Sequence, residues 1–301
     1  MTEVCVRITE FTDPACPWAY SAEPSRRRLD WLYEGCLEWV PRVVVLADTA
    51  ADYADRGLTP EALSESYRRI AIAHGMPIDT RLRPRVAGTL EACRAVVAAR
   101  LHAGELSTRR LLRALRVRNF AGELLDEPQT IAHAARDAGV EPEQLERWGD
   151  APEVARELRE DMVTARAPMA AARVLDHKLA NWSGGRRYTC PSYEITRLSD
   201  GVTISVPGFQ PFAVYDTILA NLVPGLDRRD SPGSVEEVLR WSGTPLATEE
   251  VAVVCDVDRG GAREELGRVA VEHHVGADGF WTLPVADAPV VGLAQAASAA
   301  A

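Results

Sequence analysis

The chain has 301 residues, of which 47% are hydrophobic and 26% are charged, and its formal net charge is -10 at pH 7. These values are typical of a globular protein with one or two domains, and they exclude a largely disordered or collagen-like chain. The acidic balance argues against nucleic acid or an anionic membrane surface as a partner. No run of about 18 apolar residues is present that could span a bilayer.

The N-terminal region is expected to hold a strand, a helix and a second strand. Residues 4–11 (VCVRITEF) have the pattern of a short strand, and the turn-forming Thr12-Asp13-Pro14 follows. Pro17 suits the first position of a helix, where its missing N–H costs nothing. Residues 37–46 form the second strand, at a sheet edge or with a bulge because Pro41 cannot donate a hydrogen bond. This order is the opening of an α/β unit.

Helical patterns alone occupy residues 59–180. Thr59 is expected to cap the first helix, with Pro60 at its first position. Six helical runs are expected, at residues 63–74, 90–101, 108–120, 127–138, 142–148 and 152–179. Pro168 would kink or split the last of them. The sequence thus predicts an all-helical insertion that follows the α/β opening.

Strand character returns after the insertion. Residues 191–198 and 202–206 form a predicted hairpin around the turn Ser199-Asp200-Gly201. An amphipathic helix at residues 211–222 closes this unit, and a polar linker follows at residues 224–233.

The last part, residues 234–284, is expected to be a small winged-helix-like α+β module. Its expected elements are helices at 234–241, 248–255 and 262–271 and a hairpin that turns at Asp278-Gly279. Acidic residues in the third helix make it a poor reader of DNA, so a packing or dimerisation role is favoured, and the module could support a homodimer. The alanine-rich tail, residues 285–301, is expected to be flexible.

Six cysteines are present, and most are expected to pack as small apolar side chains. The first residues lack the basic start and apolar core of a secretory signal, so we expect a cytoplasmic protein with reduced thiols. Cys16 differs from the others because a strand, a turn and a helix place it at a helix N-terminus. The helix dipole and free N–H groups there stabilise a thiolate, which makes Cys16 the candidate nucleophile.

The segment FTDPACPWAY around Cys16 resembles the active-site turn of the DsbA-like thioredoxin superfamily, especially its FrnE-type cytoplasmic branch with the signature Cys-Pro-Trp-Cys. Residues 89–94 (TLEACR) resemble a Thr…Ala-His-Arg element of that branch's helical insertion. Residues 191–212 resemble its closing hairpin and helix. The resemblance covers about residues 3–226, and it implies a thioredoxin-like core in two halves, 1–58 and 181–226, split by the helical insertion 59–180. It also implies thiol-disulfide oxidoreductase activity.

One departure from the family concerns the second cysteine of the signature, where this chain has Ala19. A dithiol enzyme resolves its mixed disulfide with that second sulfur, so exchange within this turn is not expected. The resemblance implies a cis-proline loop that packs against the turn, with Pro191 as the candidate and Cys190 just before it. Cys190 would then lie near Cys16 and could act as the resolving thiol. The alternative is that Cys190 is simply a small residue at that position.

Four further expectations concern the surroundings of Cys16. Pro17, Trp18 and Pro191 are expected to contact substrate, with Trp18 as a wall of the cleft. Cys93 is either a core residue or a substrate contact, because insertion helices cap the active-site face in this family. No metal site is expected, since His273-His274 lack partners at zinc-ligand spacing.

The leading hypothesis is an oxidoreductase that acts on a small-molecule thiol or disulfide, or on a protein disulfide. It needs no cofactor, although a low-molecular-weight thiol could serve as co-substrate. One alternative is a glutathione- or other thiol-dependent transferase or isomerase, because kappa-class glutathione transferases and 2-hydroxychromene-2-carboxylate isomerases share this architecture without the second cysteine. The other alternative is a non-catalytic thiol sensor or a protein that binds a soft metal ion.

Overall fold

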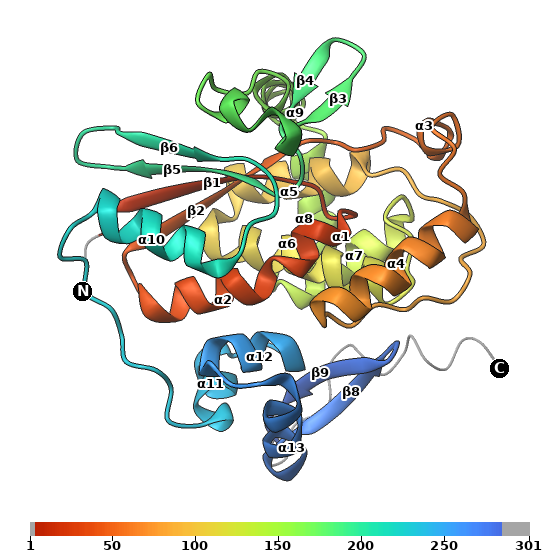
Figure 1. The fold of residues 1–301 in the computed structure, drawn as a ribbon. Helices are drawn as coiled ribbons and strands as arrows, with labels where there is room; N and C mark the ends of the chain where they lie inside the picture. Colours follow the sequence, from red (N-terminus) through yellow and green to blue (C-terminus); the bar gives the residue numbers. More distant parts are fainter. Residues whose placement is uncertain (1–3, 285–301) are drawn as a thin grey trace.

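The computed structural model describes residues 4–284, and its centre is a four-stranded sheet in the order β2-β1-β5-β6 (Figure 1). β1 (Val6–Thr12) is parallel to β2 (Leu37–Val43) and antiparallel to β5 (Ser192–Arg197). β6 (Thr203–Val206) pairs antiparallel with β5, which confirms the predicted hairpin. The sheet therefore joins the two ends of the α/β unit across the helical part of the chain.

Of the two positions predicted for Pro41, a sheet edge or a bulge, the structure shows the edge, because β2 is an outer strand. α1 (Pro17–Ser21) and α2 (Glu23–Leu32) connect β1 to β2, and α10 (Phe212–Leu222) follows β6. Buried apolar side chains of α2 and α10 share one core with all four strands, so both helices cover the same face of the sheet (Figure 1).

Seven helices make up the chain between the two halves of the sheet. They are α3 (Ala50–Ala54), α4 (Pro60–His74), α5 (Leu90–His102), α6 (Gly104–Phe120), α7 (Pro128–Asp137), α8 (Pro142–Gly149) and α9 (Pro152–Ala165). Thr59 caps α4 as predicted, since its hydroxyl accepts the backbone N–H of Ala62 at 3.3 Å. α5 is the central helix of this group, and its small alanines let neighbouring helices approach closely.

The structure corrects the long last helix that was expected at residues 152–179. α9 ends at Ala165, three residues before Pro168, and a 3-10 segment follows at Ala172–Lys178. A hairpin of β3 (Ala180–Trp182) and β4 (Gly185–Arg187) then precedes the second half of the sheet. The proline cannot continue the helical hydrogen bonds, which explains the early stop.

The C-terminal module, residues 235–282, has the expected order of helices followed by a hairpin. Its elements are α11 (Val235–Ser242), β7 (Leu246–Ala247), α12 (Thr248–Cys255), α13 (Arg259–Val269), β8 (Val271–Val275) and β9 (Asp278–Thr282). The hairpin turns at residues 276–277, not at Asp278-Gly279 as predicted, and Gly276 has a φ of 63°. Asp278 instead accepts the hydroxyl of Thr248 at 2.8 Å and pairs with Arg259 at 2.7 Å, which fixes it inside the module.

Buried ion pairs join the module to the rest of the chain. Glu250 of α12 is fully buried and accepts Arg113 of α6 at 2.6 Å, and Arg27 of α2 lies 3.5 Å from it. A second buried group holds Arg116 of α6 against Glu10 of β1 at 2.6 Å and against Glu23 of α2. The sheet, the helical insertion and the module therefore share one network of buried charges.

Two further expectations concern the membrane and the tail. Between residues 4 and 284, no helix is long and apolar enough to cross a bilayer. The expected flexible tail, residues 285–301, lies outside the described residues.

Candidate thiol active site

Cys16 lies at the turn between β1 and α1, where it is the N-cap residue of the helix. Its backbone is extended, with φ -76° and ψ 114°, and Pro17 occupies the first helical turn. The backbone of Trp18 and Ala19 favours the ionised form of the Cys16 thiol and so lowers its pKa. Only 5% of Cys16 is exposed, so the thiol sits in a nearly closed site.

The loop before β5 brings Cys190 to the same site. The Cys190–Pro191 peptide bond is cis, and the Cys16 thiol donates to the carbonyl oxygen of Cys190 with an Sγ–O distance of 3.1 Å. The two cysteines are 174 positions apart in the sequence, and both thiols are free. The structure thus places the two candidate thiols and Pro191 together.

The surroundings push the pKa values of the two thiols in opposite directions. Burial opposes ionisation of Cys16, but hydrogen bonds from the Cys190 thiol and from the backbone of Ala19 and Trp18 lower its pKa below that of an ordinary thiol. Burial and the hydrogen bond to Cys16 hold the pKa of Cys190 well above the ordinary value. Cys16 is therefore suited to attack as a thiolate, and Cys190 is suited to keep its proton.

Asp13 lies behind the turn and was not singled out in the sequence. Its carboxylate is fully buried and accepts the backbone N–H groups of Ala15 and Leu46 and the hydroxyl of Thr89, each at 2.8 Å. Burial raises the pKa of Asp13, and these donors partly offset the rise. Its place three positions before Cys16 could have indicated a residue of the site, but the sequence pattern indicated only a turn.

Cys93 takes the first of its two expected roles, that of a core residue. It is fully buried on α5, and its thiol donates to Asp13 with an Sγ–Oδ2 distance of 3.5 Å. Burial and the negative charge of Asp13 raise its pKa well above that of an ordinary thiol. Cys93 therefore supports the turn from behind and presents no surface to a substrate.

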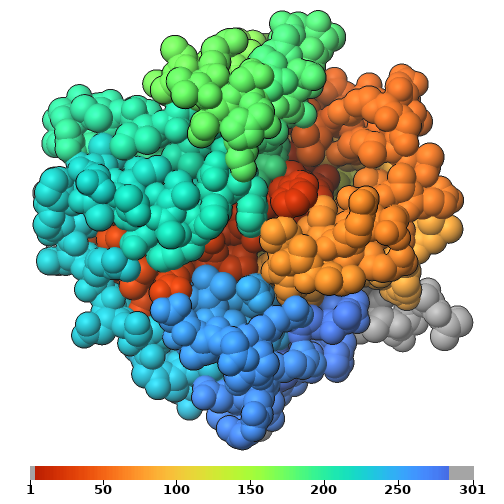
Figure 2. All heavy atoms as spheres, viewed as in Figure 1, coloured from red at the N-terminus to blue at the C-terminus, as the bar shows by residue number. Residues whose placement is uncertain are grey.

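Three rings form the outer border of the site. Trp18 is 43% exposed, and its ring centroid lies 5.1 Å from that of His74 on α4 and 5.8 Å from that of Phe209. Figure 2 shows the red surface of the turn region between the orange surface of α4 and the teal surface of the chain beyond residue 190. Pro17 is half-buried and Pro191 is buried beside this border. Sequence patterns gave no signal for His74 or Phe209, because each reaches the site from a distant segment.

The family of the chain follows from a comparison with known families. The sequence model of the DSBA-like thioredoxin domain matches residues 7–171, which include the Cys16 turn and most of the helical insertion. The chain belongs to this DSBA-like family. Among curated protein sequences, none matches the chain at a significant level. In residues 4–284 no group of three or more His, Cys, Asp or Glu side chains is arranged to hold a metal ion.

Solved structures similar to this DSBA-like protein share its fold at low sequence identity. A putative protein disulfide isomerase from Nitrosomonas europaea aligns with a TM-score of 0.53 and 17% identity, over 72% of this chain and 98% of its own. A probable DsbA oxidoreductase from Streptomyces coelicolor aligns with a TM-score of 0.50 and 20% identity, over 72% of this chain and 89% of its own. The cytosolic disulfide reductase DsbM from Pseudomonas aeruginosa aligns with a TM-score of 0.50 and 16% identity, over 72% of this chain and 100% of its own. The thioredoxin-like fold interrupted by helices is thus shared with oxidoreductases.

Proposed function

We propose that this chain catalyses thiol–disulfide exchange with Cys16 as the nucleophile and Cys190 as the resolving thiol. The observation that carries the proposal is the 3.1 Å contact between the Cys16 sulfur and the Cys190 carbonyl oxygen. Ala19 leaves the turn without a second sulfur, so a resolving thiol must come from elsewhere in the fold or from solution. Family membership supports the class of reaction, since its named structural neighbours include oxidoreductases.

The exchange has two balanced steps. The Cys16 thiolate attacks one sulfur of a substrate disulfide, so a bond forms between Cys16 and that sulfur, and the other substrate sulfur leaves as a thiolate. Cys190 then gives its proton to the leaving thiolate and attacks the Cys16 sulfur. This second step forms the Cys16–Cys190 disulfide and releases the first substrate sulfur. The substrate disulfide gains two electrons, and the protein dithiol loses them.

The narrow access to Cys16 favours a low-molecular-weight disulfide or an extended peptide segment as the substrate. Cys16 is 5% exposed, and the ring of Trp18, two residues on, packs with those of His74 and Phe209, which restricts access to the turn. We place this activity in the cytoplasm, in a FrnE-like role. DsbM, which shares the fold, is named a cytosolic disulfide reductase.

Mass spectrometry of the oxidised protein tests the proposal. The fully reduced chain is treated with hydroxyethyl disulfide and digested, and a peptide that links Cys16 to Cys190 is expected. Cys190→Ser should instead accumulate a mixed disulfide on Cys16, because no second sulfur can displace it. Cys255→Ser, which removes a half-buried thiol of the C-terminal module, is the matched control and should keep the linked peptide.

Two results would contradict parts of the proposal. A stable adduct on Cys16 in the unmodified chain, with no linked peptide, would show that Cys190 does not resolve the mixed disulfide. The resolving thiol would then be a second small molecule, which favours the monothiol or transferase alternative. An unreactive Cys16 would remove the enzyme assignment and favour a non-catalytic role.

A further inference from the structure

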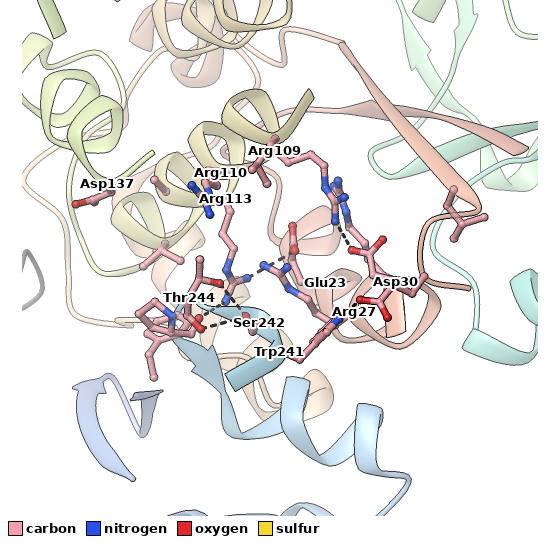
Figure 3. A pocket seen from close by; sticks show the side chains of 18 of the residues that line it. Glu23, Arg27, Asp30, Arg109, Arg110, Arg113, Asp137, Trp241, Ser242 and Thr244 are labelled. Carbon is pink, nitrogen blue, oxygen red and sulfur yellow. Dashed lines mark hydrogen bonds and ion pairs between the residues drawn. The ribbon is translucent and has the colours of Figure 1, made fainter. Parts of the chain in front are cut away.

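A cavity separate from the thiol site lies between α2, α6, α7 and the C-terminal module. Its volume is about 540 Å³, which is within the usual range for small-molecule sites, and it shares no lining residue with the surroundings of Cys16. Figure 3 shows side chains of α2, α6 and the module converging on this space. The module supplies one wall, with Trp241, Thr244 and Phe280, and this wall lies beyond the residues that the family model matches.

The charge of the cavity lining is opposite to that of the whole chain. Arginines outnumber acidic residues by seven to four in the lining, whereas acidic residues outnumber basic ones by 44 to 34 in the sequence. A local excess of guanidinium groups in an acidic protein is the pattern expected of an anion site, because their paired N–H donors match carboxylate, sulfonate and phosphate oxygens.

Two of these arginines have no acidic partner within the described part of the chain, whereas the arginines of the floor do. Arg113 is 8% exposed, donates to Glu250 at 2.6 Å, and has its Nη1 3.6 Å from the carboxylate of Glu23. Arg27 shares the same glutamate, and burial together with the positive charge of Arg113 lowers the pKa of Arg27. Arg110 and Arg136 are exposed at the rim, and their guanidinium groups form no hydrogen bond or ion pair within residues 4–284. The floor arginines are thus paired with acids, and the rim adds two cations without a partner among the described residues.

Part of the remaining lining is apolar. Trp241 of the module and Leu106 and Val117 of α6 line the cavity, and Phe280, also in the lining, is buried. A bare inorganic ion would leave these side chains without contact, whereas an organic body would bury them.

We propose that this cavity binds a small organic anion, with its acidic group held by Arg110 and Arg136 and its apolar body against Trp241 and Leu106. The site does not depend on the proposed thiol chemistry, because the two share no residues. The C-terminal module therefore supplies one wall of this binding site, in addition to packing against the core of the chain.

Fluorescence titration with 8-anilinonaphthalene-1-sulfonate tests the proposal, with neutral N-phenyl-1-naphthylamine as the uncharged comparison. One sulfonate per chain is expected, bound at least tenfold more tightly than the neutral amine. The double variant Arg110→Gln, Arg136→Gln should weaken sulfonate binding about tenfold and leave binding of the neutral amine unchanged. Arg159→Gln removes an exposed arginine of α9 that does not line the cavity, and it should bind like the parent chain. Equal binding by the parent and the double variant, or an equal loss in Arg159→Gln, would overturn the proposal.

A second measurement needs no substitution. Phenylglyoxal modifies accessible arginines, and peptide mass spectrometry gives the rate at each of them. Saturating naphthalene-1-sulfonate should slow modification of Arg110 and Arg136 at least fivefold and leave Arg159 unaffected. Unchanged rates at the two rim arginines, or the same slowing at Arg159, would show that the anion does not occupy the cavity.

Discussion

Cys190 is expected to have two roles: its sulfur resolves the mixed disulfide, and its S–H group lowers the pKa of Cys16. Two substitutions of Cys190 separate these roles. In the structure, burial raises the pKa of Cys16, and the hydrogen bond from the Cys190 thiol is the largest of the contributions that lower it. A hydrogen bond to a charged acceptor contributes about 1.5 kcal/mol, or roughly one pKa unit. Cys190→Ala should therefore raise the pKa of Cys16 by about one unit. Cys190→Ser keeps an O–H donor and should leave the pKa near its original value.

The assay is the rate of Cys16 alkylation by iodoacetamide, followed by peptide mass spectrometry across a range of pH. The midpoint of each profile reports the pKa, and it does not depend on how easily the reagent enters the site. Below its pKa, Cys16 in the alanine variant should react about tenfold more slowly. Cys255→Ala is the control and should keep the original midpoint. Equal midpoints for the alanine variant and the unmodified chain would refute the role of the Cys190 proton, as would equal rises in the alanine and serine variants.

Three more predictions concern the turn and the buried charges. Ala19→Cys should produce a disulfide between the introduced sulfur and Cys16, detected as a linked peptide, and absence of that peptide would contradict the assigned turn. Arg116→Met should lower the free energy of unfolding by about 3 kcal/mol, because Glu10 and Glu23 each lose one of two buried arginine partners, whereas Arg7→Met at an exposed pair should cost less than about 1 kcal/mol. Urea unfolding measures both, and similar losses would show that burial is unimportant. Burial alone would raise the pKa of Glu23, but Arg116 and neighbouring arginines lower it. Its stabilisation is therefore present above the ordinary glutamate value of 4.5 and lost as the pH falls below it. Unfolding at pH 6, 4 and 3 should show a shallower decline in Glu23→Gln, and an identical slope would contradict this.

Much of the fold could be predicted because its signals are local. The turn at Cys16, the capping of α4 by Thr59 and the edge strand that contains Pro41 each depend on residues a few positions apart. The juxtaposition of Cys16 and Cys190 was different, since only the resemblance to a known family suggested it. A contact across 174 positions leaves no periodic trace in one sequence.

The missed features depend on long-range contacts or on very short elements. β3 and β4 have three residues each, none of them buried, so they lack the apolar alternation that marks a strand. Asp278-Gly279 is a strong turn signal, yet the ion pairs of Asp278 hold it in β9. The lining of the arginine-rich cavity comes from segments more than 200 positions apart, such as those of Arg27 and Trp241.

The place of Glu250 in the core has a consequence for the order in which the chain is synthesised. Glu250 follows Arg113 by 137 positions and Arg27 by 223. β1 also cannot pair with β5 until residues from 192 onward have been synthesised. A nascent chain can therefore form its helices early but cannot complete its core until most of it has left the ribosome. A product that stops before residue 250 leaves both arginines without their shared acid, which makes early termination products ready substrates for proteases.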